Sequence, residues 1–157
     1  MGIVGAPGTY TIGTLNVAGL KSPKSQDKFE ILQQKKLDIL VLQETNCSAG
    51  LEKEWRTTFY PKKSYWTKDC AFIIDPKIPH SNFRPHLNNR LILLDIVLNE
   101  VPITLIGMHA PNKYTDRIQF FNNVTNLKFN KENILLGGDL NQIENPSLDR
   151  FPPQQHT

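Results

Sequence analysis

The stretch Ile134-Leu135-Leu136-Gly137-Gly138-Asp139-Leu140-Asn141 passes from an apolar run, through two glycines, to a carboxylate and an amide. A short apolar run of this kind is typical of a buried strand. Glycines at the point where a strand leaves its sheet let a backbone or a ligand approach closely. Asp139 and Asn141 are therefore expected at the mouth of a sheet, where such groups suit holding a water molecule or a phosphoryl oxygen.

Three further strand ends carry polar side chains of the same kind. Asn16 ends the first predicted strand, Glu44 closely follows the apolar run at 39–42, and His109 and Asn112 follow a third apolar run. In layered folds, side chains at strand ends on one edge converge on a single cleft. Glu44 is the most informative of them, because an unpaired charge at the end of a buried strand is unfavourable and a bound cation would relieve it.

The apolar patterns along the chain predict about six strands and two helices. Strands are expected at 10–16, 39–42, 71–74, 91–98, 101–108 and 133–136, and helices at 25–36 and 115–128. Segment 46–69 is polar and mixed with no predicted element, and 76–89 is expected to be an irregular loop. Strands joined partly by helices and partly by hairpins indicate an α/β fold in which sheets pack together and helices lie outside.

The composition is that of one globular domain. Of the 157 residues, 39% are hydrophobic and 21% are charged, which excludes an intrinsically disordered chain. The net charge of +3 fits a polyanionic partner and equally an ordinary lysine-rich surface. Cys47 and Cys70 have no metal-type spacing, so we expect two plain thiols in a reducing compartment. No secretory signal or bilayer-length apolar stretch is evident, so we expect an intracellular protein without a membrane partner.

The residue types at the strand ends suit hydrolysis of a phosphodiester. Mg²⁺ prefers oxygen ligands and keeps several waters, so one or two carboxylates suffice to bind it. A second carboxylate can orient and deprotonate a water molecule. Amides such as those of Asn16 and Asn141 can position phosphate oxygens without adding negative charge. A histidine can donate to an oxygen on which charge develops in the transition state.

Four motifs follow one another at these strand ends. They are Thr14-Leu15-Asn16-Val17 with Gly19-Leu20, Asp38-Ile39-Leu40-Val41-Leu42-Gln43-Glu44-Thr45, His109-Ala110-Pro111-Asn112 and Gly137-Gly138-Asp139-Leu140-Asn141. In this order they resemble the motifs of the endonuclease/exonuclease/phosphatase superfamily. Within it, the chain is most similar to the endonuclease domain of non-LTR (LINE-type) retrotransposons, on the strength of Arg117 with Phe120-Phe121 and of Leu148-Asp149-Arg150.

The resemblance implies a four-layered α/β sandwich, in which two packed mixed β-sheets are flanked by helices. The domain would span 9–151, with 1–8 as a loose leader and 152–157 as a tail. The implied activity is Mg²⁺-dependent hydrolysis of DNA phosphodiester bonds, with Mn²⁺ as the alternative cation and the nucleus as the location of a retrotransposon enzyme. No small-molecule cofactor is evident, and the resemblance fixes no oligomeric state.

The resemblance also implies roles around the metal and the water. Matched by motif, Glu44 would ligate the metal, and Asn16 would help to place the metal or the phosphate. Asp139 would activate the attacking water. Asn141 would hold that water or the phosphate.

Further roles concern the nucleic acid. Asn112 would contact the scissile phosphate, and Lys113 and Arg117 would add contacts to the DNA. His109 stands where family members commonly have tyrosine, and either side chain can donate a hydrogen bond to a phosphate oxygen.

The sequence departs from the family pattern in three places. Ala18 occupies a position where abasic-site endonucleases of the superfamily carry aspartate, which weakens the repair-enzyme interpretation. Asp69-Cys70-Ala71-Phe72 replaces a glycine-led strand start. The family ends with a Ser-Asp-His motif, and no such motif follows Asn141. We therefore expect a domain incomplete at its C-terminus, with unpaired strand edges and exposed apolar faces.

Alternatives stay open at this point. The first alternative to an active endonuclease is a catalytically dead fragment or a binding module of the same origin. The second and weaker alternative is a phosphatase or an abasic-site endonuclease of the superfamily. Each site residue also has a structural interpretation: Glu44 as a solvated charge, Asp139 and Asn141 in an Asx turn, and His109 as a hydrogen-bonded structural histidine.

Basic and aromatic side chains allow two interpretations each. Lysines line either a phosphate-binding face or an ordinary solvated surface: Lys21, Lys24, Lys62, Lys63, Lys68 and Lys113. Aromatic side chains either stack on bases or pack in the core, and core packing is favoured: Trp55, Tyr65 and Trp66. The helix at 115–128 is expected to turn an apolar stripe inward: Ile118, Phe121, Val124 and Leu127.

Overall fold

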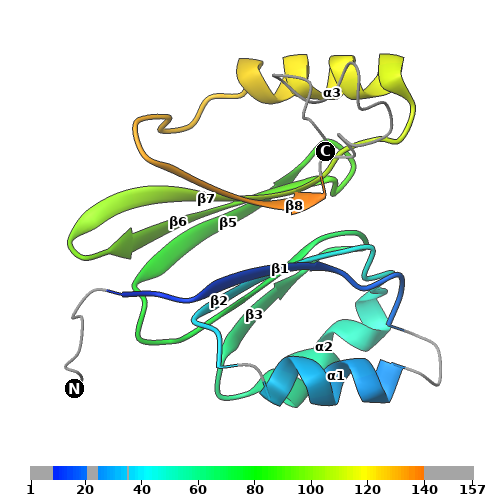
Figure 1. Cartoon of the computed structure of the whole chain (residues 1–157), viewed down its shortest axis with the longest axis vertical. Coiled ribbons are helices and arrows are strands. Elements are labelled where there is room, and N and C mark those ends of the chain that lie inside the picture. Colours follow the sequence, from blue (N-terminus) through cyan, green and yellow to red (C-terminus); the bar gives the residue numbers. More distant parts are fainter. Residues whose placement is uncertain (1–8, 21–24, 35, 140–157) are drawn as a thin grey trace, which may run out of the picture.

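Two four-stranded sheets pack face to face, with helices on their outer faces (Figure 1). The computed structural model describes residues 9–20, 25–34 and 36–139. The first sheet has the order β1 (Ile12–Asn16), β2 (Ile39–Gln43), β4 (Ala71–Ile74), β3 (Lys63–Trp66). The second has the order β5 (His80–His86), β6 (Leu91–Leu98), β7 (Val101–His109), β8 (Ile134–Asp139). Helices α1 (Ser25–Gln34) and α2 (Ala49–Phe59) cover the first sheet, and α3 (Tyr114–Asn126) covers the second. The predicted four-layered α/β sandwich is confirmed.

Each sheet is mixed, and its one parallel pair is joined by a helix. Strand β2 runs parallel to β1 after the crossover through α1, and β8 runs parallel to β7 after the crossover through α3. All other pairs are antiparallel. Parallel strands bring their carboxyl ends to the same edge, so Asn16 lies beside Gln43, and His109 beside Asp139. This topology gathers the predicted strand-end side chains.

The core between the sheets is built from aliphatic strands that are buried on both faces. All five residues of β2 are buried, as its continuous apolar run predicts. The sheets approach closely where glycine replaces a side chain: a Cβ built at Gly137 would lie 3.0 Å from Val41, and one at Gly107 would lie 2.9 Å from both Val41 and Phe72. Each buried aliphatic side chain contributes about 1.5–3 kcal/mol, so this layer dominates the stability of the sandwich.

Two segments that lacked predicted elements are in fact regular. Segment 46–69 contains α2 and β3, and 76–89 contains β5. Helix α2 turns Trp55 and Phe59, four residues apart, onto the core, a helical spacing partly hidden by the polar residues between them. Strand β5 is an edge strand with Pro85 and a register irregularity between Ser81 and Arg84, so its sequence lacks the alternation of an ordinary strand.

The packing of the aromatic residues and of α3 partly differs from prediction. Trp55 and Trp66 are buried, with ring centroids 5.1 Å apart, which confirms their core role. Helix α3 buries Val124 as predicted, together with Arg117 and Phe120. The predicted stripe was therefore wrong at its start, where Ile118 is exposed, because the helix is rotated to place Phe120 on the second sheet.

Several predictions fall outside the described residues. They concern the leader at 1–8, Asn141, Leu148-Asp149-Arg150 and the tail at 152–157. None of the helices in the described ranges has both the length and the apolar character needed to span a membrane.

Candidate active site

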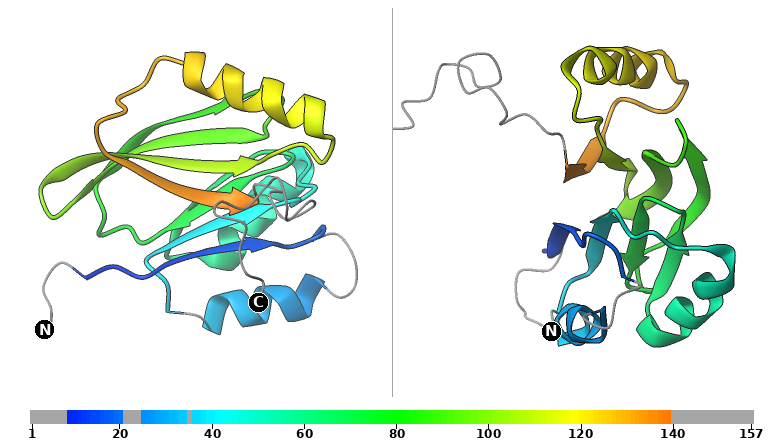
Figure 2. Two further views of the ribbon diagram at one scale, coloured as in Figure 1. Left: turned by 45° about the horizontal axis from the view of Figure 1, so that its top comes forward. Right: turned by 90° about the vertical axis from the view of Figure 1, so that its right-hand side faces the viewer.

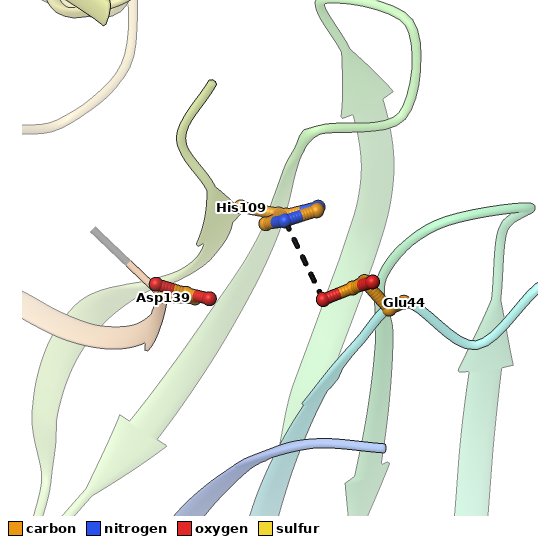
Figure 3. A group of neighbouring side chains, drawn as sticks. All are labelled: Glu44, His109 and Asp139. Carbon is orange, nitrogen blue, oxygen red and sulfur yellow. Dashed lines mark ion pairs between the residues drawn. The ribbon is translucent and has the colours of Figure 1, made fainter. Parts of the chain in front are cut away.

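Side chains from both sheets meet at the carboxyl ends of the two parallel pairs. Asn16 ends β1, Glu44 directly follows β2, His109 ends β7 and Asp139 ends β8. Glu44, His109 and Asp139 point toward one another across the gap between the sheets (Figure 3). Four side chains predicted from separate strand ends are thus brought into one cluster.

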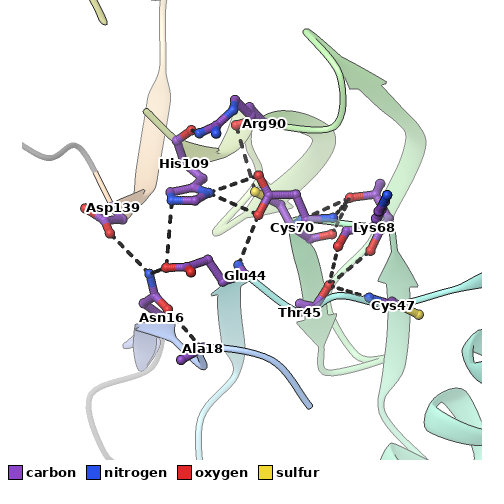
Figure 4. Close-up of polar contacts among 12 residues, drawn as sticks. Asn16, Ala18, Glu44, Thr45, Cys47, Lys68, Cys70, Arg90, His109 and Asp139 are labelled. Atoms are coloured by element: carbon purple, nitrogen blue, oxygen red, sulfur yellow. Dashed lines mark hydrogen bonds and ion pairs between the residues drawn. The ribbon is translucent and has the colours of Figure 1, made fainter. Parts of the chain in front are cut away.

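Asn16 links the two carboxylates of this cluster (Figure 4). Its amide nitrogen donates to Glu44 Oε2 and, over 3.2 Å, to Asp139 Oδ2. Its amide oxygen accepts the backbone N–H of Ala18 at 2.9 Å. With its oxygen directed at that N–H, Asn16 turns its amide nitrogen toward the two carboxylates. Asn16 therefore holds the two carboxylates in place, and its predicted part in placing the metal or the phosphate stays a prediction.

The backbone of Glu44 is held in a left-handed conformation, with φ 55°. This conformation is uncommon for residues with a side chain and persists only where neighbours enforce it. The Glu44 carbonyl accepts from Gly19 N at 2.6 Å, and its N–H donates to Asp69 Oδ1 at 3.1 Å. The next residue, Thr45, donates its N–H to the Asp69 carbonyl at 2.9 Å. Loops on both sides of β2 thus fix the direction of the Glu44 side chain.

Gly138 places Asp139 at the mouth of the site. It has φ 140°, and a Cβ there would lie 2.0 Å from the Met108 carbonyl oxygen. No residue with a side chain can occupy this position without moving β7 or β8. The Asp139 carbonyl then accepts the Ala110 N–H at 2.8 Å. The second glycine of the Gly-Gly-Asp motif is therefore required by backbone packing between the two strands.

His109 is oriented by Asp69, a residue that the strand-end argument missed. His109 Nδ1 lies 3.0 Å from both carboxylate oxygens of Asp69. The carboxylate only accepts, so Nδ1 carries the hydrogen and Nε2 faces the site, 3.9 Å from Glu44 Oε2. The hydrogen bond with Asp69 raises the pKa of His109 above its ordinary value, against the opposing effect of burial. The Asp69 carboxylate thus orients the His109 ring and makes the ring easier to protonate.

Asp69 was detectable in principle. It lies just before β4, not after a strand, but β4 runs antiparallel to β2. The start of β4 therefore lies at the same edge as the end of β2. A sequence argument that counts the amino ends of antiparallel neighbours would include it.

The donor set fits a divalent cation. One oxygen each from Glu44 and Asp139 and a ring nitrogen of His109 all lie within 4.8 Å of one another. Two carboxylate oxygens suit Mg²⁺, and a set that adds an imidazole also suits Mn²⁺. A ring nitrogen ligates a metal only when it is unprotonated, so protonated His109 would donate a hydrogen bond beside a cation held by the two carboxylates.

The three residues predicted to contact the nucleic acid differ in their exposure. Asn112 and Lys113 are exposed on the loop after β7. Arg117 is buried, and its guanidinium donates to the Asn112 carbonyl at 3.1 Å and lies 5.5 Å from the Tyr114 ring centre. It is thus positioned to shape the loop that carries Asn112.

The predicted lysine face is divided between the two ends of the first sheet. Lys63 begins β3 opposite Ile74, and Lys62 donates to the Leu37 carbonyl at 2.6 Å, so both lie at the end away from the cluster. Lys68 adjoins Asp69 at the near end. Lys62 and Lys63 therefore lie apart from the cluster, Lys68 lies near it, and Lys21 and Lys24 lie outside the described residues.

The fold matches solved structures of other proteins. TDP2 from D. rerio, humanized by 14 mutations, aligns with a TM-score of 0.68 at 14% identity, over 84% of this chain and 62% of that chain. An AP endonuclease from Archaeoglobus fulgidus aligns with a TM-score of 0.65 at 18% identity, over 88% and 62%. A β-hairpin deletion mutant of beta toxin from Staphylococcus aureus aligns with a TM-score of 0.57 at 15% identity, over 89% and 70%. No protein-family model and no curated protein sequence matches the chain.

At these identities the likeness establishes the fold that the chain shares with TDP2 and the AP endonuclease. The chain spans 62% of the length of each of those two chains. The choice of site residues rests on the distances and hydrogen bonds described above and not on these comparisons.

Proposed function

We propose that this chain is the endonuclease domain of a LINE-type retrotransposon, which hydrolyses DNA phosphodiester bonds with a bound divalent cation, Mg²⁺ or alternatively Mn²⁺. The observation that carries the proposal is the meeting of Glu44, Asp139 and His109 within 4.8 Å. Asn16 and Asp69 hold these groups from either side. The shared fold adds support, because one structure of D. rerio TDP2 was solved with a single-strand DNA product.

The residues divide the chemistry between them. Asp139 accepts a proton from water as the water oxygen forms its bond to phosphorus, the bond to the leaving oxygen breaks, and the leaving oxygen takes a proton from solvent. His109 Nε2 donates to a non-bridging phosphate oxygen as negative charge develops there. Glu44 would be the main ligand of the cation, and Asn16 holds the two carboxylates at a fixed spacing. The cation, when bound, supplies positive charge that stabilises the phosphate in the transition state.

Two points favour the retrotransposon assignment over a repair enzyme. Ala18 stands in the loop beside Asn16 and offers only its backbone N–H to the site. Abasic-site endonucleases of the resembled superfamily carry an aspartate at this position. The Arg117 that supports the LINE resemblance is buried under the Asn112 loop, where it would set the conformation of a phosphate contact.

A binding module without turnover is the second candidate. It is favoured by the cluster itself, because carboxylates can bind a cation without turnover of a substrate. A module of this kind would keep cation and DNA affinity through the same cluster.

Plasmid nicking separates the two candidates. Purified chain with Mg²⁺ is expected to nick supercoiled plasmid, and Glu44→Ala or Asp139→Ala is expected to abolish nicking. Glu54→Ala, on the exposed face of α2, is the matched control and should retain it. A parent chain no more active than the Glu44→Ala/Asp139→Ala double variant would contradict the enzyme and leave the binding module. Faster cleavage of a duplex with one abasic site than of an intact duplex would instead favour the repair alternative.

A further inference from the structure

Lys28 places a positive charge on the inward face of α1, the helix that lies beneath the first sheet on the side away from the second sheet (Figure 2). It stands one helical turn before Leu32, which is 4% exposed, so the two side chains point the same way. It also lies near the amino end of the helix, where the helix dipole disfavours a cation. A lysine normally extends into solvent, whereas Lys28 is partly buried. Solvation of a surface charge therefore does not account for this position.

The Lys28 ammonium holds the loop that follows β1. Its Nζ donates to the Val17 carbonyl and, over 3.1 Å, to the Gly19 carbonyl. Between these two residues Ala18 is left-handed, with φ 48°, and Gly19 is left-handed as well, with φ 86°. A left-handed alanine persists only where its neighbours enforce it. The two charged hydrogen bonds contribute to that constraint from the outer face of the sheet.

The N–H groups of the same loop point to the candidate site. The Ala18 N–H donates to Asn16 Oδ1 at 2.9 Å, and the Gly19 N–H donates to the Glu44 carbonyl at 2.6 Å. Asn16 in turn bridges the two carboxylates of the cluster (Figure 4). A chain of hydrogen bonds thus runs from the Lys28 ammonium, through the backbone of the loop, to both carboxylates.

We propose that Lys28 is a positioning residue for the cation site, acting through the loop at 17–20 on Asn16 and Glu44. This role rests on the proposed function, in which the carboxylates of Glu44 and Asp139 bind a divalent cation. Lys28 acts through geometry and not through attraction, because its own positive charge repels a cation. The sign of its effect therefore distinguishes the two. Loss of the positioning contacts weakens cation binding, whereas loss of a repelling charge alone strengthens it.

Titration calorimetry of the full chain with Mn²⁺ alone tests this role. Lys28→Met keeps an apolar stem without donors and should weaken Mn²⁺ binding by about three- to tenfold, less than the roughly 10–100-fold typical when a direct partner of a metal ligand is lost. Lys28→Arg keeps charged donors and should bind Mn²⁺ more tightly than Lys28→Met. Lys53→Met, at an exposed position on α2, is the matched control and should bind like the parent.

Urea titrations of the same variants separate positioning from a general effect on folding. A lowered free energy of unfolding in Lys28→Met with Mn²⁺ affinity equal to or above that of the parent would overturn the role of Lys28. Lys28→Arg binding no better than Lys28→Met would overturn it too. A parent chain that does not bind Mn²⁺ would overturn the proposed function and this role with it, whereas equal affinity of parent and Lys28→Met would overturn the role alone. If Lys28→Met does not fold, Lys28→Gln takes its place under the same criteria.

Hydrogen exchange in EDTA tests the connection to the loop without a cation. The amide of Gly19, which donates to the Glu44 carbonyl, should exchange at least about fivefold faster in Lys28→Met than in the parent, as expected for a local opening. The amides of β6, in the other sheet, should exchange at the same rate in both. Equal exchange of the Gly19 amide in the two proteins would overturn the role of Lys28.

Discussion

The two sides of the candidate site are built differently. On one side, Glu44 and Asp139 share a single bridging amide, and the Glu44 side chain is 43% exposed. On the other side, His109 and Asp69 form a hydrogen-bonded pair whose side chains are only 12% and 19% exposed. The carboxylate side therefore has room and negative charge for a cation or a water molecule. On the histidine side, the Asp69 carboxylate fixes the orientation of the His109 ring without any ligand.

This difference shows that groups that react and groups that position them are found at different kinds of place in the sequence. Groups that meet a ligand lie at open strand ends and leave a visible trace in the sequence. A positioning group such as Asp69 needs only to reach its partner, from whichever strand passes nearby. Substitutions on the two sides should accordingly change different measured quantities.

The largest effect is expected from Asp139→Asn. An amide cannot accept the proton of the attacking water, so the single-turnover nicking rate should fall by about 10³-fold, within the range for a lost general base. Asp116→Asn, on the exposed first turn of α3, is the control and should change the rate less than twofold. Retention of more than a tenth of the parent rate by Asp139→Asn would remove Asp139 from the proton-accepting role.

Glu44→Gln should lower the affinity of the site for the cation. Loss of the carboxylate charge should raise the Mn²⁺ concentration needed for half-maximal nicking by at least about tenfold, one factor of ten corresponding to roughly 1.4 kcal/mol. Titration calorimetry with Mn²⁺ alone checks the same point without DNA. Glu54→Gln is the matched control, and equal Mn²⁺ affinity in both variants would place the cation elsewhere.

Sequence reasoning identified the carboxylate side of the site and His109, but it missed Asp69. Asn16, Glu44, His109 and Asp139 follow or end strands, so alternation and apolar runs locate them. Asp69 precedes a strand, and its position beside His109 depends on the antiparallel direction of β4, which no local pattern encodes. Strand β5 was missed because Pro85 and its irregular register, features that protect an edge, also remove the alternation by which strands are recognised.

Asp69→Asn should move the pH dependence more than the rate. The amide still accepts from His109 Nδ1, but the negative charge that raises the pKa of His109 is gone. If the imidazolium is the donor, nicking is complete below the pKa of His109 and is lost as pH rises through it, so the variant should lose activity at lower pH. We expect a rate loss of about tenfold at neutral pH. Asp75→Asn, at the far end of β4, should leave the profile in place, and an unmoved profile in Asp69→Asn would contradict the role of Asp69.

The smallest effect is expected on stability, measured with EDTA to remove metal ions. Because the folded-state pKa of His109 is raised, its pair with Asp69 stabilises the fold fully below the unfolded value of about 6.5 and loses this contribution as pH rises through the folded value. His109→Gln should therefore lower the free energy of unfolding by about 1–2 kcal/mol at pH 5.5 and by less at pH 9, as urea titrations can measure. His86→Gln, on edge strand β5, should change it by less than about 0.5 kcal/mol at pH 5.5. A difference between parent and His109→Gln that grows with pH would mean that His109 is held neutral, and the imidazolium donor would then have to be abandoned.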